Sequence, residues 1–205
     1  MPKREAPLDT LGHFLPPDTY PLVQSFLREY KVHLTITRAR ESILGDYRHA
    51  THADNHRISV NGNLNVYAFL ITLLHELAHL LTFDSYGNRV ASHGKEWKGQ
   101  FSILLKQFLQ AGVFPDDIRD ALARSLHNPA ATTCAEDDLM RVLRRYDAKR
   151  DGVFMVEELE LGARFVIKGG KQFRRGAKVR KRYQCMEEGT GSVYLFSPVY
   201  EVRKL

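Results

Sequence analysis

The chain has 205 residues and a mass of 23.5 kDa, with 43% hydrophobic and 26% charged residues. This composition is that of an ordinary globular protein with a real core, and it excludes collagen-like, coiled-coil and wholly disordered proteins. We expect no stretch that approaches the ~20 apolar residues needed to span a bilayer, and no secretory signal at the N-terminus. Two cysteines do not make a disulfide framework, so we predict a cytoplasmic protein without a membrane partner.

Charge is distributed unevenly along the chain. Residues 161–205 carry 11 basic and 3 acidic side chains, whereas the first 160 residues have a net charge of −2. A nearly neutral body is therefore followed by a basic module. Such asymmetry indicates either an anionic partner of the module, such as nucleic acid, or a solvated face that improves solubility.

The first part of the chain predicts a helix and three strands, after a loose, proline-rich lead over residues 1–17. Asp18 or Thr19 can cap a helix in which apolar residues repeat at helical spacing up to Tyr30. Alternating or β-branched segments then predict strands at residues 32–37, 43–48 and 57–61.

The next segment, from about residue 65 to 83, is apolar on most sides, which predicts a central buried helix. Further helices are predicted at residues 92–111, 116–127 and 133–146, and strands at 164–167, 172–173, 180–184, 193–196 and 199–202. The fold class expected is α+β, with a small sheet packed on the central helix, a helical linker and a small all-β module. The boundaries expected are a loose lead (1–17), the main domain (18–128), the linker (129–152) and the basic β module (153–205).

The central helix contains the sequence His75-Glu76-Leu77-Ala78-His79, which has the pattern H-E-x-x-H. Residues i and i+4 lie on one face of a helix, one turn apart, so both imidazoles can bind the same Zn²⁺ ion. Glu76 lies beside them and can take a proton from a water that the metal activates. Without a metal, two histidines and a glutamate on a buried helix would need other polar partners. The pattern therefore predicts a zinc site with a catalytic glutamate.

A catalytic zinc site needs a third protein ligand. The next histidine after His79 is His93, at the start of the following helix, and a loop over residues 84–91 lets that helix turn back alongside the first. Glu96, one turn further on, is the rival ligand, because other H-E-x-x-H enzymes take a glutamate from the downstream helix. The spacing alone leaves both residues open.

Several segments together resemble the SprT-like metallopeptidase family. They are the H-E-x-x-H helix, the sequence HGKEW that begins at His93, and the segments 36–38, 45–48 and 56–61. The resemblance covers residues 18–111, roughly half of the chain. It implies a zincin-type α+β fold, the zinc ligands His75, His79 and His93, and Glu76 as the catalytic residue. Because a eukaryotic member of the family degrades proteins cross-linked to DNA, the resemblance also implies proteolysis near DNA.

The C-terminal module departs from the family pattern. Many SprT-like proteins end in a zinc ribbon with paired C-x-x-C motifs, but Cys134 and Cys185 stand alone here, so that zinc site cannot form. We expect a degenerate, zinc-ribbon-like β module that is held together by its own apolar core.

Basic residues in this module are interleaved with Phe173 and Tyr183. In one interpretation they form a surface that tracks phosphates and stacks bases, with nucleic acid as the partner. In the other they are solvated strand faces, with the aromatic residues in the core. The candidate nucleic-acid-binding residues are Arg174, Arg175, Lys178, Arg180, Lys181 and Arg182.

These observations predict a zinc-dependent metallopeptidase with a protein substrate, in which Glu76 moves the proton between the attacking water and the leaving amine. We expect the third strand to offer its edge to an extended peptide by β-augmentation. The residues of that strand are Arg57, Ile58, Ser59, Val60 and Asn61. Tyr47, Arg48 and Tyr86 are candidates for stabilising the oxyanion. Two other functions stay open: a zinc hydrolase of a non-protein amide or ester, and a DNA-binding protein whose zinc is structural.

Overall fold

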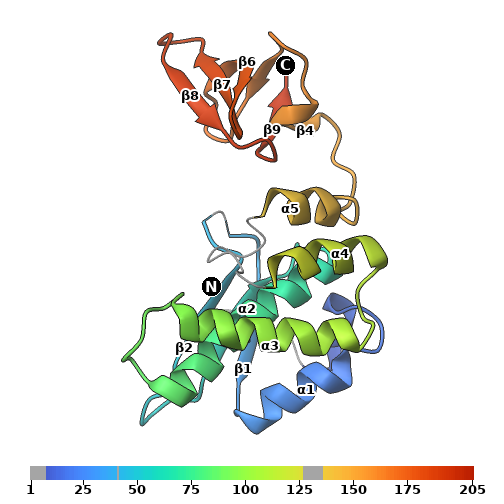
Figure 1. The fold of residues 1–205 in the computed structure, drawn as a ribbon, viewed down its shortest axis with the longest axis vertical. Coiled ribbons are helices and arrows are strands. Elements are labelled where there is room, and N and C mark those ends of the chain that lie inside the picture. Colours follow the sequence, from blue (N-terminus) through green and yellow to red (C-terminus); the bar gives the residue numbers. More distant parts are fainter. Residues whose placement is uncertain (1–7, 41, 127–135) are drawn as a thin grey trace. The chain divides into compact units, whose positions relative to one another are not determined.

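The structure is a computed structural model that describes residues 8–40, 42–126 and 136–205. The chain forms two compact units, residues 1–147 and 148–205 (Figure 1). The first unit contains the 3-10 helix η1 (Leu8–Phe14), α1 (Tyr20–Glu29), β1 (His33–Thr37), β2 (Gly45–Arg48), β3 (Arg57–Asn61), α2 (Val66–Tyr86), α3 (Lys95–Gln110), α4 (Asp116–Ser125) and α5 (Asp137–Arg144).

The central helix of the first unit is α2. Asn65 caps its N-terminus, and the side-chain oxygen of Asn65 accepts hydrogen bonds from the backbone N–H groups of Tyr67 (3.1 Å) and Ala68 (2.9 Å). Gly87 ends the helix at a φ of +60°, a conformation that glycine adopts without strain. Nearly every side of α2 between these ends is buried, as its apolar sequence predicts.

The small sheet of the first unit has the strand order β1-β3-β2. β1 runs parallel to β3, and β2 runs antiparallel to it, with Tyr47 opposite Ile58. Because side chains alternate along a strand, Ile58 and Val60 point toward α2 and are buried. The sheet therefore covers one side of the helix that carries the H-E-x-x-H motif.

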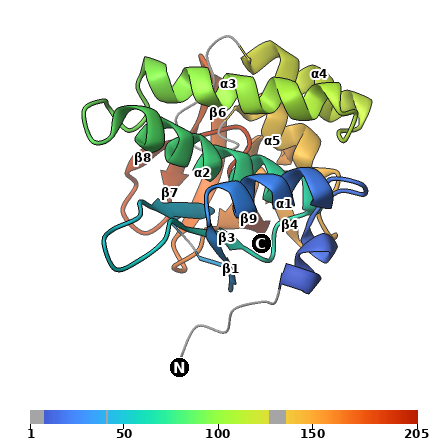
Figure 2. The ribbon, with the colours of Figure 1, turned by 90° about the horizontal axis from the view of Figure 1, so that it is seen from below.

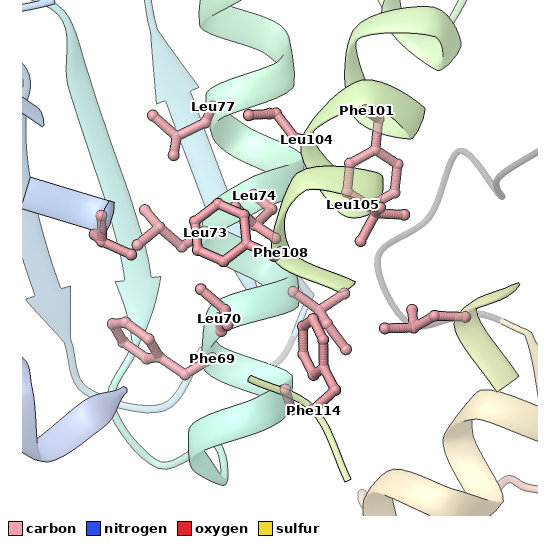
Figure 3. Close-up of a cluster of buried hydrophobic side chains, with 14 of the residues drawn as sticks. Phe69, Leu70, Leu73, Leu74, Leu77, Phe101, Leu104, Leu105, Phe108 and Phe114 are labelled. Carbon is pink, nitrogen blue, oxygen red and sulfur yellow. The ribbon is translucent and has the colours of Figure 1, made fainter. Parts of the chain in front are cut away.

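The other side of α2 packs against α3, so α2 lies between the sheet and α3 (Figure 2). Leucines of α2 meet apolar residues of α3 and the following loop in one continuous core (Figure 3). The core residues labelled in Figure 3 are Phe69, Leu70, Leu73, Leu74, Leu77, Phe101, Leu104, Leu105, Phe108 and Phe114. This burial holds the backbone of α2 in place at the position of the motif.

Two expectations about the first unit are corrected. The predicted loose lead is not loose over residues 8–15, because Leu11 and Leu15 are buried in the core. The predicted linker contains α5, which belongs to the first unit: its Leu139 and Leu143 are buried, and the Asn65 side-chain amide donates to the backbone oxygen of Leu143 (3.0 Å). The remainder of the lead, residues 1–7, and residues 129–135 of the linker lie outside the described residues.

The expectation that no segment reaches the length and apolarity of a membrane span is wrong for α2. By length and composition alone, this helix of 21 residues could cross a bilayer. Most of it is buried inside the first unit, however, and its middle carries polar residues that face other elements. These are the properties of the core helix of a globular domain.

The second unit is an antiparallel sheet with the strand order β4-β9-β5-β6-β7-β8. Its elements are β4 (Val153–Met155), the 3-10 helix η2 (Val156–Glu158), β5 (Arg164–Val166), β6 (Gln172–Val179), β7 (Arg182–Glu187), β8 (Val193–Phe196) and β9 (Glu201–Lys204). It has its own apolar core around Phe165, Phe173 and Tyr183, in which Cys185 is a buried free thiol. Cys134 lies outside the described residues. The predicted α+β fold, with a sheet on a long helix and an all-β module, is confirmed.

Candidate metal centre and active site

The H-E-x-x-H residues lie in the middle of α2, at the level where the sheet and α3 both contact it. His75 and His79 are one turn apart on the same face, and their Nε2 atoms are separated by 3.3 Å. Glu76 is almost completely buried, with 5% of its surface exposed. Local helix geometry therefore brings two imidazoles together beside a carboxylate that is shielded from water.

His93 reaches the same place from the turn before α3. The backbone N–H of Gly94 donates to the carbonyl oxygen of Ala91 (3.0 Å), which folds this turn back toward α2. The Nε2 atoms of His93 and His75 are 3.2 Å apart. One ligand atom of each of His75, His79 and His93 lies within 4.8 Å of the other two, and these residues, called the histidine cluster below, could hold a metal ion.

Glu96, the rival third ligand, does not belong to the histidine cluster. One carboxylate oxygen lies 3.8 Å from Nζ of Lys95, and the other lies close to Gly94 at the start of α3. A negative charge is favourable there because the N-terminus of a helix carries a partial positive charge. The geometry thus favours His93 over Glu96 as the third ligand.

Trp97 forms an apolar wall of the histidine cluster. Its ring centroid lies 4.6, 5.3 and 4.7 Å from those of His75, His79 and His93, and its side chain is fully buried. No role was predicted for Trp97 from the sequence. The signal that could have indicated it was the spacing of four residues between Trp97, in the first turn of α3, and His93, just before that helix.

Burial keeps the imidazoles of the histidine cluster uncharged. Desolvation, followed by the nearby His79 and His93, lowers the pKa of His75 to about 3. Desolvation and His93 lower the pKa of His79 to about 4, and desolvation also lowers the pKa of His93. Neutral imidazole is the form that binds metal ions, so the nitrogen donor set fits a divalent cation.

The same burial acts on Glu76 in the opposite direction. Desolvation raises the pKa of its carboxyl group to about 8; the negative charge of Asp46 adds to this effect and the positive charge of Arg40 opposes it. Arg40 is held over the sheet by hydrogen bonds to the side chains of Asn61 (2.7 Å) and Ser59 (2.9 Å). A carboxyl group that titrates near neutral pH can both accept and donate a proton.

Among the candidate oxyanion donors, Tyr47 lies against the histidine cluster, whereas Tyr86, the last residue of α2, is exposed at the end of that helix. The ring of Tyr47 is parallel to that of His79, with the centroids 6.4 Å apart, and its hydroxyl group hydrogen-bonds to Nδ1 of His56 (2.8 Å). Arg48, the next residue of β2, points to the other face of the sheet and pairs there with Asp46 (3.1 Å). The structure thus separates Tyr47 from Arg48, as the sequence could not.

The predicted role of the strand Arg57–Asn61 as a substrate-binding edge is wrong. This strand is β3, and it is paired on one side with β1 and on the other with β2. Its backbone N–H and C=O groups are therefore used within the sheet and cannot pair with a peptide. Among the described residues, β2 is an edge strand, and it is the edge that lies against α2.

The basic residues predicted to bind nucleic acid lie on the β6–β7 hairpin of the second unit. Arg174 pairs with Glu188 (3.0 Å), and the guanidinium of Arg175 lies 4.3 Å from the ring centroid of Tyr183. Phe173 and Tyr183 are buried in the core of the unit, as the second of the two interpretations predicts, so they do not form a base-stacking surface. The remaining cations gather at the tip of the hairpin, called the hairpin tip below: Lys178, Arg180, Lys181 and Arg182.

A small mixed sheet packed on a long helix, with an H-E-x-x-H motif and a third histidine from the next helix, is the architecture of an H-E-x-x-H metalloprotein domain. Within that class, the family of this domain can be named. Residues 22–111 match the model of the SprT-like family, and this part of the chain is a SprT-like family domain. The family indicates a metallopeptidase. No curated protein and no solved structure matches the chain.

Proposed function

We propose that the protein is a zinc-dependent metallopeptidase. The observation that carries the proposal is the convergence of three neutral imidazoles beside a buried glutamate of the same helix. Tetrahedral zinc with Zn–N bonds of ~2.0–2.1 Å places two ligand nitrogens about 3.3–3.4 Å apart. The Nε2 separations of 3.3 Å between His75 and His79 and 3.2 Å between His75 and His93 agree with this value.

The residues around the site suit the hydrolysis of a peptide bond. Zn²⁺ held by the histidine cluster would polarise a carbonyl group and lower the pKa of a water molecule toward ~7. Glu76 accepts a proton from the attacking water and returns it to the amine nitrogen as the C–N bond breaks. Its raised pKa favours the protonated form that donates to the amine, and the positive charge of a bound Zn²⁺ would favour the ionised form that accepts a proton from the water. Trp97 excludes water from the side of the site that it covers.

We propose that an extended peptide substrate pairs with β2. An unpaired strand edge binds an extended chain through backbone hydrogen bonds, with alternate side chains directed to either face of the sheet. Gly45 and Tyr47 of β2 face α2 and the histidine cluster, so a peptide at this edge would pass next to the candidate metal site. Tyr47 is the hydroxyl donor that we assign to the developing oxyanion.

The test is the cleavage of fluorescently labelled casein by the full chain. We expect turnover by the zinc-loaded protein, its loss after treatment with a chelator, and its return when Zn²⁺ is added to the metal-free protein. Cleavage that persists after complete removal of the metal would contradict the proposal. Hydrolysis of small esters or amides without any cleavage of casein or peptides would support the alternative, a hydrolase of non-protein substrates.

A structural zinc site is the second alternative. Such sites are closed, with four protein ligands, whereas catalytic sites keep a coordination position open. In the described part of the chain, the ligand group contains three histidines only. This donor number favours a catalytic site over a structural one.

For the second unit, we propose binding of nucleic acid through phosphate contacts at the hairpin tip. Arg164 and Arg174 pair with the carboxylate of Glu188, and Lys171 pairs with that of Glu187, so three of the other cations are in contact with negative charge. Within the described residues, the ion pairs of this unit involve other cations, and the hairpin tip forms no comparable pair. Binding of this kind is independent of sequence and weakens steeply with salt.

Replacing Arg180, Lys181 and Arg182 together with alanine should therefore weaken DNA binding at low salt. If each contacts a phosphate, the slope of log K against log salt should fall by about 2–3, since each contact contributes ~0.9. The measurement is a fluorescence-anisotropy titration of duplex DNA at several salt concentrations. The matched control replaces Arg119, Arg150 and Arg164, which are paired with carboxylates. Equal losses in both variants would mean that only net charge matters and would contradict a specific role of the hairpin tip.

A further inference from the structure

We propose that Gly45 is a positioning residue for Glu76: the missing side chain at position 45 leaves the space that the glutamate occupies. The inference rests on the proposed function in one respect only, the role of Glu76 as the proton carrier. Gly45 is the first residue of β2, where it lies opposite Val60 of β3. Side chains of β2 alternate between the faces of the sheet, and position 45 shares its face with Tyr47.

A side chain at position 45 would collide with Glu76. A Cβ atom built on Gly45 would lie 2.8 Å from Cγ and 2.9 Å from Cδ of Glu76, and closer still to its Oε1. Carbon atoms in contact are normally ~3.5–4.0 Å apart. Three consecutive atoms of the glutamate therefore lie against the backbone of β2, which is how the structure defines the position of the carboxylate.

The backbone of Gly45 does not itself require glycine. Gly45 does not have a positive φ. The glycines that do, among the described residues, are Gly87, Gly112, Gly152, Gly162, Gly169, Gly170 and Gly191. Any L-residue could therefore adopt the local conformation. A glycine inside a strand otherwise weakens it, and a close approach by another group is one recognised reason for its presence. Here the approaching group is the proposed catalytic side chain.

The side chain of Glu76 has little space into which it could move away from an added group at position 45. Its helix is held between the sheet and α3, and only 5% of its surface is exposed. A methyl group at position 45 must therefore push the carboxylate out of its place beside the histidine cluster, while the imidazoles of the cluster stay where they are.

The first measurement is the activity of Gly45→Ala in the zinc-loaded full chain. Because a displacement of ~1 Å of a reacting group costs about 10²-fold in rate, we expect kcat to fall by that order while KM changes little. Zinc content should remain that of the wild type, since no ligand is touched. The control is Gly99→Ala on α3, where an added Cβ meets nothing within 4 Å; its kcat should be unchanged.

The second measurement needs no activity and uses the thermal melting of unit 1, followed by the fluorescence of Trp97, the single tryptophan of the chain. Gly45→Ala should lower the melting temperature by roughly 3–8 °C in the wild-type background. In the Glu76→Ala background the colliding atoms are gone, so the same change should lower it by less than about 1 °C. If Gly45→Ala alone does not fold, recovery of the fold in the double variant is the expected result.

The two measurements separate the inference from the proposed function. Equal destabilisation by Gly45→Ala in both backgrounds, or an unchanged kcat in an active enzyme, would overturn the positioning role. Failure of the double variant to fold when Glu76→Ala folds would also overturn it. A wild-type protein that cleaves no peptide but shows the stability coupling would contradict the peptidase proposal and leave the contact between Gly45 and Glu76 supported.

Discussion

Replacing Glu76 with glutamine is expected to lower peptide turnover by about 10²–10⁴-fold, the usual contribution of a positioned acid–base group. Glutamine has nearly the same shape, but its amide group neither accepts the proton of the attacking water nor returns it to the leaving amine. The three imidazoles of the histidine cluster are unchanged, so the zinc content should be that of the wild type. The measurement is kcat/KM for labelled casein, with metal analysis of the same preparation.

The same variant has a second readout in the metal-free protein. The pKa of Glu76 is raised from its ordinary value of 4.5 to about 8, chiefly by burial. The carboxyl group therefore favours the folded state while it is protonated, and this stability is lost as the pH rises through about 8. Glutamine cannot ionise, so the melting temperature of Glu76→Gln should fall less than that of the wild type between about pH 5 and about pH 9.

Glu96→Gln is the matched control for this prediction. Glu96 is also a partly buried glutamate near the site, but its carboxylate is directed to the start of α3. We expect its turnover to equal that of the wild type. Wild-type turnover by Glu76→Gln would mean that another group carries the proton, and it would remove the chemical basis of the peptidase proposal.

Replacing His93 with alanine should reduce zinc affinity by more than about 100-fold. Mutation of a residue that only hydrogen-bonds to a metal ligand already costs up to about 100-fold, and loss of a ligand should cost more. His93 supplies the third nitrogen, and it is the only one that comes from outside α2. Affinity is measured by competition with a chelator of known zinc affinity. The fluorescence of Trp97 gives an independent signal, because its ring contacts the rings of all three histidines.

Two controls accompany His93→Ala. His52 lies in an exposed loop, and His52→Ala should bind zinc as the wild type does. Glu96→Ala tests the rival ligand and should likewise keep its affinity. A large loss of zinc in Glu96→Ala, with little loss in His93→Ala, would show that the third ligand had been assigned to the wrong residue.

Part of the second unit shows why strand limits are hard to predict from sequence. The chain was expected to form a short strand at residues 172–173, but β6 extends from Gln172 to Val179. The register shifts between Arg175 and Lys178, and at Gly176 an added Cβ would collide with the backbone oxygen of Gln184. Gly176 is thus a point of close approach inside the hairpin.

The order of the strands in the small sheet also could not be predicted from the sequence. Each of the three strands was recognised from its own residues, because alternation and β-branching are local properties. Which strand lies in the middle depends on pairing between segments far apart in the chain, and the pattern of Arg57–Asn61 fits a central strand as well as an edge strand. For this reason the sequence predicted a free edge at β3, whereas in the structure β3 is the central strand and β2 lies at an edge.

The sequence by itself determined the candidate metal ligands of α2 and the glutamate between them, because a spacing of four residues on a helix places side chains on one face whatever surrounds them. It also determined the α+β class, through the periodicity of its apolar residues. Only the tertiary structure decided that His93 completes the histidine cluster and that the ring of Trp97 packs against it. The same holds for the close approach of the Gly45 backbone to Glu76. Those contacts join separate elements, and they arise from the packing of α2 between the sheet and α3, which no local pattern encodes.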